Sequence, residues 1–125
     1  MCPDTHVLIL LEQMKHTEVN LQINIRHGND HFITPERMAL LRMIRTKGSL
    51  RAAAQSLSMS YQTAWTLIDA MNQVASTPLV AKQRGGNGGG GAIISDYGNI
   101  IMNEYDAIEK EVIKFTRLLN TEINL

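Results

Sequence analysis

Helix boundaries divide the middle of the chain into three short helices, and this spacing constrains the fold more than any other feature. Thr34-Pro35 marks a helix start, because threonine caps the N-terminus and proline suits the first helical position. Gly48 stops that helix, and Ser49 can cap a second one at once. Ser58-Met59-Ser60 leaves room only for a tight turn, and Pro78 forbids continuation of the third helix. The predicted helices span residues 34–46, 50–57 and 61–74.

Short strands are predicted on both sides of these helices. Residues 21–26 alternate apolar and polar side chains, and the turn at 27–30 returns the chain into a second strand at 31–33. Residues 79–83 and 92–94 are predicted to form another hairpin, around a segment (85–91) that holds six of the nine glycines. A further helix is expected at residues 6–16.

A long helix is predicted from Ser95-Asp96 to the end of the chain. Its apolar residues recur at alternating spacings of four and three, which is the heptad pattern of a helix that packs against another helix. The helix either packs on its own domain or pairs with a second copy, and we favour a homodimer. The predicted dimer residues are Ile101, Tyr105, Ile108, Val112, Phe115 and Leu119.

Two helices joined by a three-residue turn form a helix-turn-helix, and a following hairpin makes it a winged helix-turn-helix. Small Ala54 suits the place where the helices cross, and Leu57 and Leu67 suit packing on the preceding helix. The fold class is mainly α with small β-hairpins (α+β). We predict an extension at 1–19, a winged helix-turn-helix domain at 20–95 and a dimerisation helix at 96–125.

The distribution of charge is more informative than its total. The chain has 12 basic and 12 acidic residues, which argues against a nucleic-acid binder. However, residues 35–91 carry a net charge of +5, whereas 1–34 carry −2 and 92–125 carry −3. A basic middle can direct a local field at a polyanion, although chance clustering of solvated charges gives the same numbers.

The remaining composition points to the cytoplasm. The single cysteine, Cys2, cannot form an intrachain disulfide, which favours a reducing compartment. No apolar run approaches the roughly 18 residues of a membrane span, and the apolar run at 7–11 lacks the basic start of a signal peptide. We therefore expect a cytoplasmic protein with no membrane partner.

The third helix would enter the major groove of DNA with its N-terminal residues nearest the bases. Gln62 can read adenine with its amide, and Thr63 or Thr66 can offer a hydroxyl or touch a thymine methyl. Caps and cations nearby can hold phosphates, although the serines can equally serve as caps alone, and Trp65 is expected to be in the core or partly in the core. The predicted DNA-binding residues are Ser49, Arg51, Ser60, Tyr61, Gln62, Thr63, Thr66, Lys82, Arg84, Gly86 and Gly88.

The glycine-rich segment has three interpretations. It can be a wing tip that approaches phosphates, an anion-binding nest, or a dinucleotide loop, since Gly86, Gly88 and Gly91 satisfy G-x-G-x-x-G. The dinucleotide reading lacks its βαβ unit, and no Gly-Lys-Ser/Thr follows as in a P-loop. We favour the wing tip.

Catalytic motifs are absent from the sequence. His27 and His31 can approach each other across the predicted hairpin, but no cysteine pair or H-E-x-x-H accompanies them. No G-x-S-x-G is present, and no carboxylates are paired in an apolar setting. We predict that the chain is not an enzyme and has no cofactor and no metal.

Several segments in the middle of the chain together match a known family. They are Gly48-Ser49-Leu50-Arg51-Ala52-Ala53-Ala54, Leu57-Ser58-Met59-Ser60-Tyr61-Gln62-Thr63-Ala64-Trp65, Ile68-Asp69-Ala70-Met71-Asn72, Pro78-Leu79-Val80, and Gln83 before the glycine run. With these segments the chain resembles the N-terminal DNA-binding domain of the molybdate-responsive ModE-type transcriptional regulators, from about residue 20 to 105. Its helix-turn-helix is also similar, less specifically, to that of the LysR family.

The resemblance implies a homodimer that binds operator DNA, with Tyr61, Gln62, Thr63 and Thr66 on the recognition helix and residues 82–91 in the wing. Full-length ModE-type regulators carry C-terminal molybdate-binding domains, and this sequence stops at Leu125. The small-molecule effector is therefore left open. Two other functions stay as alternatives: a protein-interaction module on a winged-helix scaffold, and small-oxyanion binding at the glycine-rich segment.

Overall fold

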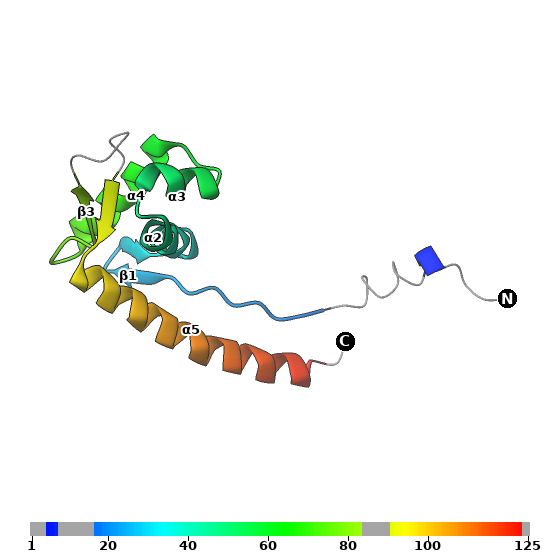
Figure 1. Ribbon diagram of the computed structural model, residues 1–125. Helices are drawn as coiled ribbons and strands as arrows, with labels where there is room; N and C mark the ends of the chain where they lie inside the picture. The colour runs from blue at the N-terminus through cyan, green and yellow to red at the C-terminus, as the bar shows by residue number, and fades with distance from the viewer. Residues whose placement is uncertain (1–4, 8–16, 84–90, 124–125) are drawn as a thin grey trace. The chain divides into compact units, whose positions relative to one another are not determined.

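The computed structural model describes residues 5–7, 17–83 and 91–123 (Figure 1). The prediction of helices mixed with small antiparallel strand pairs and a long C-terminal helix is confirmed. Of the helix predicted at 6–16, only residues 6 and 7 are described, and both are helical. In chain order, the elements are β1 (Ile25–His27), β2 (Asp30–Ile33), α2 (Pro35–Lys47), α3 (Leu50–Ser56), α4 (Tyr61–Val74), β3 (Val80–Gln83), β4 (Gly91–Ile94) and α5 (Asp96–Glu122).

The chain divides into two compact units. The larger unit comprises residues 22–108, and the smaller one combines residues 1–21 with 109–125. Within the smaller unit, the side-chain amide of Asn120 bonds both backbone polar groups of Val19. Its oxygen accepts from the Val19 N–H at 2.5 Å, and its nitrogen donates to the Val19 carbonyl at 3.3 Å.

The helix starts in the middle of the chain lie where the capping residues predict them. The hydroxyl oxygens of Thr34, Ser49 and Ser60 accept hydrogen bonds from backbone N–H groups three residues later, at 3.2, 3.2 and 3.0 Å. Gly48 ends α2 in the left-handed region with φ of 69°. These local bonds satisfy N–H groups that a helix leaves without internal partners.

The turn between α3 and α4 depends on one unusual backbone conformation. Ser58 has φ of 55°, in the left-handed region that favours glycine. The residues around it close the end of α3: the Met59 N–H donates to the Ala54 carbonyl at 3.0 Å, and the Leu57 N–H donates to that of Ala53 at 3.2 Å. The left-handed conformation could not be predicted from the sequence, because serine, unlike glycine, does not favour it.

One hydrophobic core holds the larger unit together. Small residues allow α3 and α4 to approach, since Ala53, Ala54 and Ala64 are all buried. The first half of α5 completes the core with Met102 and Tyr105, which are 0% and 2% exposed. The largest fully buried side chains are Ile33, Met38, Leu40, Leu41, Ile44, Leu50, Ile68, Met71, Leu79 and Met102.

The first hairpin is shorter than predicted. The strand expected at 21–26 is found only at Ile25–His27, with a register irregularity between Ile25 and Arg26. Leu21 is 42% exposed, and no described strand pairs with residues 21–24. Alternation alone therefore overestimated this strand, because β2 ends at Ile33, just before the cap of α2, and offers it no further partner.

The second hairpin is attached to α4 and α5 by specific hydrogen bonds. Its strands pair from Val80↔Ile94 to Gln83↔Gly91. The Asn72 amide of α4 donates to the Val80 carbonyl at 3.1 Å and accepts from the Leu79 N–H at 2.8 Å. Ser95 caps α5, where its hydroxyl oxygen accepts from the Gly98 N–H at 2.9 Å and its N–H donates to the Leu79 carbonyl at 2.9 Å. These bonds fix the base of the hairpin.

Among the described residues, no helix is both long enough and apolar enough to cross a membrane.

Candidate nucleic-acid interface

Helix α4 has one buried face and one exposed polar face. Ala64, Ile68 and Met71 are buried, and Leu67, predicted with them, is half-buried. The opposite face exposes the predicted residues Gln62, Thr63 and Thr66, together with Asp69 and Gln73. The spacing of 62, 66, 69 and 73 places these side chains in one stripe along the helix. Asp69 was not among the predicted DNA-binding residues, although its helical spacing from Thr66 places it on this face.

The hydroxyl groups at the start of α4 are already oriented by the protein. The Ser60 hydroxyl donates to Thr63 Oγ1 at 2.8 Å, and the Thr66 hydroxyl donates to the Gln62 carbonyl at 3.0 Å. The hydroxyl protons of Ser60 and Thr66 are engaged, whereas Thr63 accepts a hydrogen bond and keeps its own hydroxyl proton. Thr63 therefore offers an outside partner a donor as well as a lone pair and a methyl group, and Thr66 offers a lone pair and a methyl group. Among the described residues, none hydrogen-bonds the side-chain amide of Gln62, which keeps both donors and its acceptor.

Two cations and two aromatic rings form a continuous row along α4, which we call the cation–aromatic row. The Arg51 guanidinium of α3 lies 4.9 Å from the centroid of the Tyr61 ring. The Tyr61 and Trp65 rings are 6.1 Å apart and meet edge to face at 85°. The Lys82 ammonium of β3 lies 3.9 Å from the centroid of Trp65, which is half-buried as predicted. The row therefore connects α3, α4 and β3.

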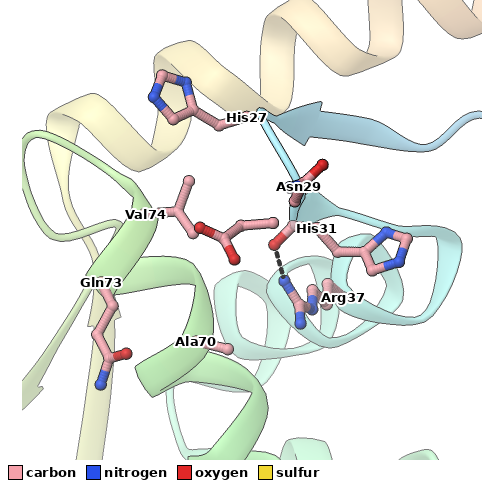
Figure 2. A pocket seen from close by; sticks show the side chains of 8 residues that line it. His27, Asn29, His31, Arg37, Ala70, Gln73 and Val74 are labelled. Atoms are coloured by element: carbon pink, nitrogen blue, oxygen red, sulfur yellow. Dashed lines mark hydrogen bonds between the residues drawn. The ribbon is translucent and has the colours of Figure 1, made fainter.

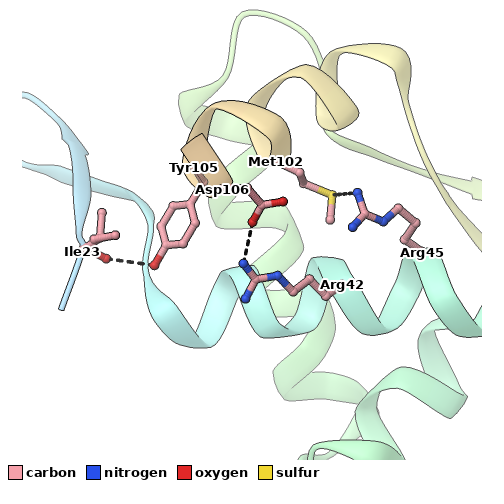
Figure 3. A network of polar contacts seen from close by, with 6 residues as sticks. All are labelled: Ile23, Arg42, Arg45, Met102, Tyr105 and Asp106. Atoms are coloured by element: carbon pink, nitrogen blue, oxygen red, sulfur yellow. Dashed lines mark hydrogen bonds and ion pairs between the residues drawn. The ribbon is translucent and has the colours of Figure 1, made fainter. Parts of the chain in front are cut away.

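Other basic side chains of residues 35–91 make contacts within the domain. Arg37 Nη1 donates to the His31 and Phe32 carbonyls at 2.6 and 3.1 Å and so joins α2 to β2 (Figure 2). Arg42 pairs with Asp106 of α5 at 2.6 Å, and Arg45 Nη1 lies 3.9 Å from the Met102 sulfur (Figure 3). Three of the seven basic residues of segment 35–91 are thus engaged in contacts within the domain.

An open pocket of about 630 Å³ lies between the first hairpin, Arg37 and the second half of α4. The imidazoles of His27 and His31 are at its edge and point away from each other (Figure 2). The described part of the chain contains no group of three or more histidine, cysteine or carboxylate side chains able to hold a metal ion.

Three predicted DNA-binding residues, Arg84, Gly86 and Gly88, lie in segment 84–90, outside the described residues. Two other predicted DNA-binding residues, Ser49 and Ser60, are the N-terminal caps of α3 and α4, which agrees with their predicted capping role. Gly91 forms an isolated bridge with Ser49, which brings the start of β4 beside the start of α3.

The predicted dimer residues separate into two groups. Tyr105 is 2% exposed, and its hydroxyl donates to the Ile23 carbonyl at 3.3 Å (Figure 3). Ile101 is half-buried and packs against the same core, so Tyr105 and Ile101 serve their own domain. A heptad pattern cannot distinguish packing within a chain from packing between chains. Further along α5, Ile108 and Phe115 are 43% and 53% exposed, and Val112 and Leu119 are partly exposed.

Known proteins are similar to this chain over roughly 60 to 80% of its length. The transcriptional regulator ModE of Haemophilus influenzae is 36% identical over 97 residues, which are 78% of this chain and 37% of that protein. The molybdenum-pterin-binding protein MopB of Rhodobacter capsulatus is 39% identical over 90 residues, 72% of this chain and 33% of MopB. The DNA-binding transcriptional dual regulator ModE of Escherichia coli K12 is 39% identical over 77 residues, 62% of this chain and 29% of that protein.

The matched region is related to the ModE-type regulators. The resemblance to ModE-type regulators is thereby supported, and the assignment of this region as their DNA-binding domain stays a prediction. The chain spans about a third of the length of these relatives. The relatives are named as regulators and molybdenum-related binding proteins, not as enzymes. No family model matches the chain.

Proposed function

We propose that the chain is a sequence-specific DNA-binding transcriptional regulator that acts in the cytoplasm. In this proposal, residues 20–95 form a winged helix-turn-helix, with α4 as the recognition helix and the second hairpin as the wing. The observation that carries it is the exposed polar face of α4, which Arg51 and Lys82 flank through the cation–aromatic row. The names of the ModE relatives support a regulatory role.

The exposed face of α4 reads the bases in the major groove. Gln62 has an unengaged amide that can bond both the N6 and N7 positions of adenine. Thr63 and Thr66 each present a methyl group and an acceptor oxygen, which suit a thymine methyl or the amino group of cytosine or adenine, and the Thr63 hydroxyl can also donate to a base acceptor. The carboxylate of Asp69 accepts from a cytosine amino group and repels phosphate, so it adds selectivity rather than affinity.

Phosphates are held at the edges of this face. Arg51 and Lys82 supply the positive charge, and the N-terminal turns of α3 and α4, capped by Ser49 and Ser60, supply N–H groups and a favourable dipole. Arg84, Gly86 and Gly88, which lie outside the described residues, are proposed as further phosphate contacts from their positions in the sequence. Such contacts position the protein on the duplex without reading its sequence.

The regulator acts as a homodimer. The exposed apolar residues of the second half of α5, led by Ile108 and Phe115, supply the surface that a second copy covers. A symmetric dimer would bind two half-sites about one helical turn, roughly 34 Å, apart.

Selection of bound duplexes from a random pool tests the proposal. We expect an enriched pair of inverted half-sites and, with the selected duplex, a steep fall of affinity with salt, because each neutralised phosphate releases counterions. Absence of binding to any duplex at low salt would show the proposal to be wrong. A winged-helix protein-interaction module would instead keep its protein partner after Arg51 and Lys82 are both changed to glutamate.

A second candidate function is binding of a small oxyanion such as molybdate at the glycine-rich segment, and the relative MopB is named as a molybdenum-pterin-binding protein. Calorimetric titration with molybdate, and with sulfate as a control, tests it. A flat molybdate titration removes this candidate and leaves the DNA-binding proposal unchanged.

A further inference from the structure

We infer that Tyr61 and Trp65 are positioning residues for DNA binding: their rings hold Arg51 and Lys82 ready to contact phosphates and hold β3 against α4. The inference rests on the proposed function, because it assigns how the two phosphate-binding cations are placed. Neither aromatic ring needs to touch a base in this role.

The placement of Lys82 follows from the strand that carries it. Side chains alternate along a strand, so Lys82 lies on the same face of β3 as Val80, which is buried at 3% exposure. The side chain therefore extends along α4, where the ammonium lies 3.9 Å from the centroid of the Trp65 ring. Tryptophan is the most favourable ring for a cation, and this distance is well inside the roughly 6 Å limit of such contacts.

Arg51 is held at the other end of the row. It is the second residue of α3, and its guanidinium lies 4.9 Å from the ring of Tyr61, the first residue of α4. This contact spans the turn between the two helices. Tyr61 and Trp65 are four residues apart, which places their rings on neighbouring turns of α4 in edge-to-face contact. Each ring thus holds one cation and supports the other ring.

The cation–aromatic row reduces the loss of side-chain entropy on DNA binding. Free lysine and arginine side chains sample many rotamers, and fixing them on a phosphate is unfavourable. A side chain already held on a ring loses less freedom. An ammonium on a ring face has three N–H donors and can direct the outer ones at a phosphate oxygen. The Trp65 face that Lys82 covers is closed to base stacking.

A double-mutant cycle on DNA affinity tests the coupling. The wild type, Lys82→Met, Trp65→Leu and the double variant are compared on the selected duplex at one salt concentration. Lys82→Met keeps the apolar stem and removes the charge, and we expect about tenfold weaker binding. If Trp65 acts through Lys82, Trp65→Leu weakens binding several-fold, and the double variant binds about as Lys82→Met does. Trp65→Phe, which keeps an aromatic ring, should retain most of the DNA affinity that Trp65→Leu loses.

Two results would overturn the inference. One is a double variant whose fold-loss of DNA affinity equals the product of the two single fold-losses, which would show that the two residues act independently. The other is a folded Trp65→Leu protein, verified by its thermal melt, with unchanged affinity. If the wild type binds no duplex at all, the proposed function fails, and the result is distinct from either of these.

Fluorescence supplies a measurement that needs neither DNA nor the Trp65→Leu protein. Trp65 is the single tryptophan of the chain, so all indole emission reports on the row. Lys82→Met should change the intensity or wavelength of this emission, because the cation leaves the ring. Lys47→Met, which removes an exposed lysine at the end of α2, is the matched control and should leave emission unchanged. Identical emission of Lys82→Met and wild type would also overturn the inference.

Discussion

Gly98 of α5 packs directly against the backbone carbonyl of Leu79, so that a Cβ atom at position 98 would overlap the carbonyl oxygen and lie 2.8 Å from Cγ2 of Ile94. The same carbonyl accepts the Ser95 N–H at 2.9 Å. This close approach joins the start of α5 to the base of the second hairpin, and it explains why a glycine lies within the first turns of a helix.

Gly98→Ala should destabilise the protein. Alanine favours a helix by about 1 kcal/mol over glycine, but the added methyl group meets backbone that cannot move away cheaply, and overpacking costs about 1–3 kcal/mol. We expect a net loss, measured as a lower midpoint of urea unfolding. Asn103→Ala, at an exposed position of the same helix, serves as the control and should raise the midpoint slightly, because alanine favours a helix and meets no packed backbone there. An increased midpoint for Gly98→Ala would contradict the close packing.

Ser58→Gly should stabilise the protein by up to about 1 kcal/mol. The left-handed conformation at Ser58 costs an ordinary residue about 1–2 kcal/mol, and glycine avoids most of this cost while losing more entropy on folding. Thermal unfolding measures the difference. Ser56→Gly, inside the last turn of α3, is the matched control and should destabilise by roughly 0.5–1 kcal/mol. The same sign for both variants would argue against the turn geometry.

The Arg42–Asp106 ion pair should contribute modestly and depend on salt. Both side chains are 37% exposed, so water screens the 2.6 Å contact. Asp106→Asn should lower the free energy of unfolding by about 0.5–1 kcal/mol at low salt and by less at 1 M salt. Glu104→Gln changes an exposed carboxylate on the same helix and should have little effect. An equal loss at both salt concentrations would show that the pair acts through packing instead.

Gln62→Ala should weaken and relax DNA recognition under the proposed function. Loss of a bidentate adenine contact costs about 1–3 kcal/mol on the preferred duplex and much less on a duplex changed at that base pair. Gln73→Ala removes the same side chain from the far end of the same stripe, and we expect a smaller effect. Competition binding with the two duplexes measures both. If Gln62→Ala weakens both duplexes equally, Gln62 does not read a base.

Phe115→Glu should weaken self-association at least tenfold, because it places a charge in the apolar surface that we propose a second copy covers. Sedimentation equilibrium measures the dimer dissociation constant. Lys110→Glu, an exposed change of charge on the same helix, is the control. A monomeric wild type would disprove the dimer itself. An unchanged dimer dissociation constant for Phe115→Glu would show that the dimer interface does not include Phe115.

Local signals in the sequence were sufficient to predict the helices of the middle segment. The bounds predicted for α4 agree with the structure, and those of α2, α3 and the second hairpin differ by about one residue. Caps and breakers act within a few residues of themselves, so they are readable without tertiary context. The first strand was overestimated because a strand also requires a partner, which its own alternation does not reveal.

The amino-acid sequence by itself determined where the helices begin and end, which face of α4 is apolar, and which region carries positive charge. Only the tertiary structure decided how individual side chains are used. It placed Tyr105 in its own core rather than on an exposed seam, engaged Arg37 and Arg42 in contacts within the domain, and brought Lys82 onto Trp65 across 17 positions of sequence. Caps and helix faces depend on neighbouring residues, whereas these contacts depend on the packing of distant segments, which leaves no local pattern in the sequence.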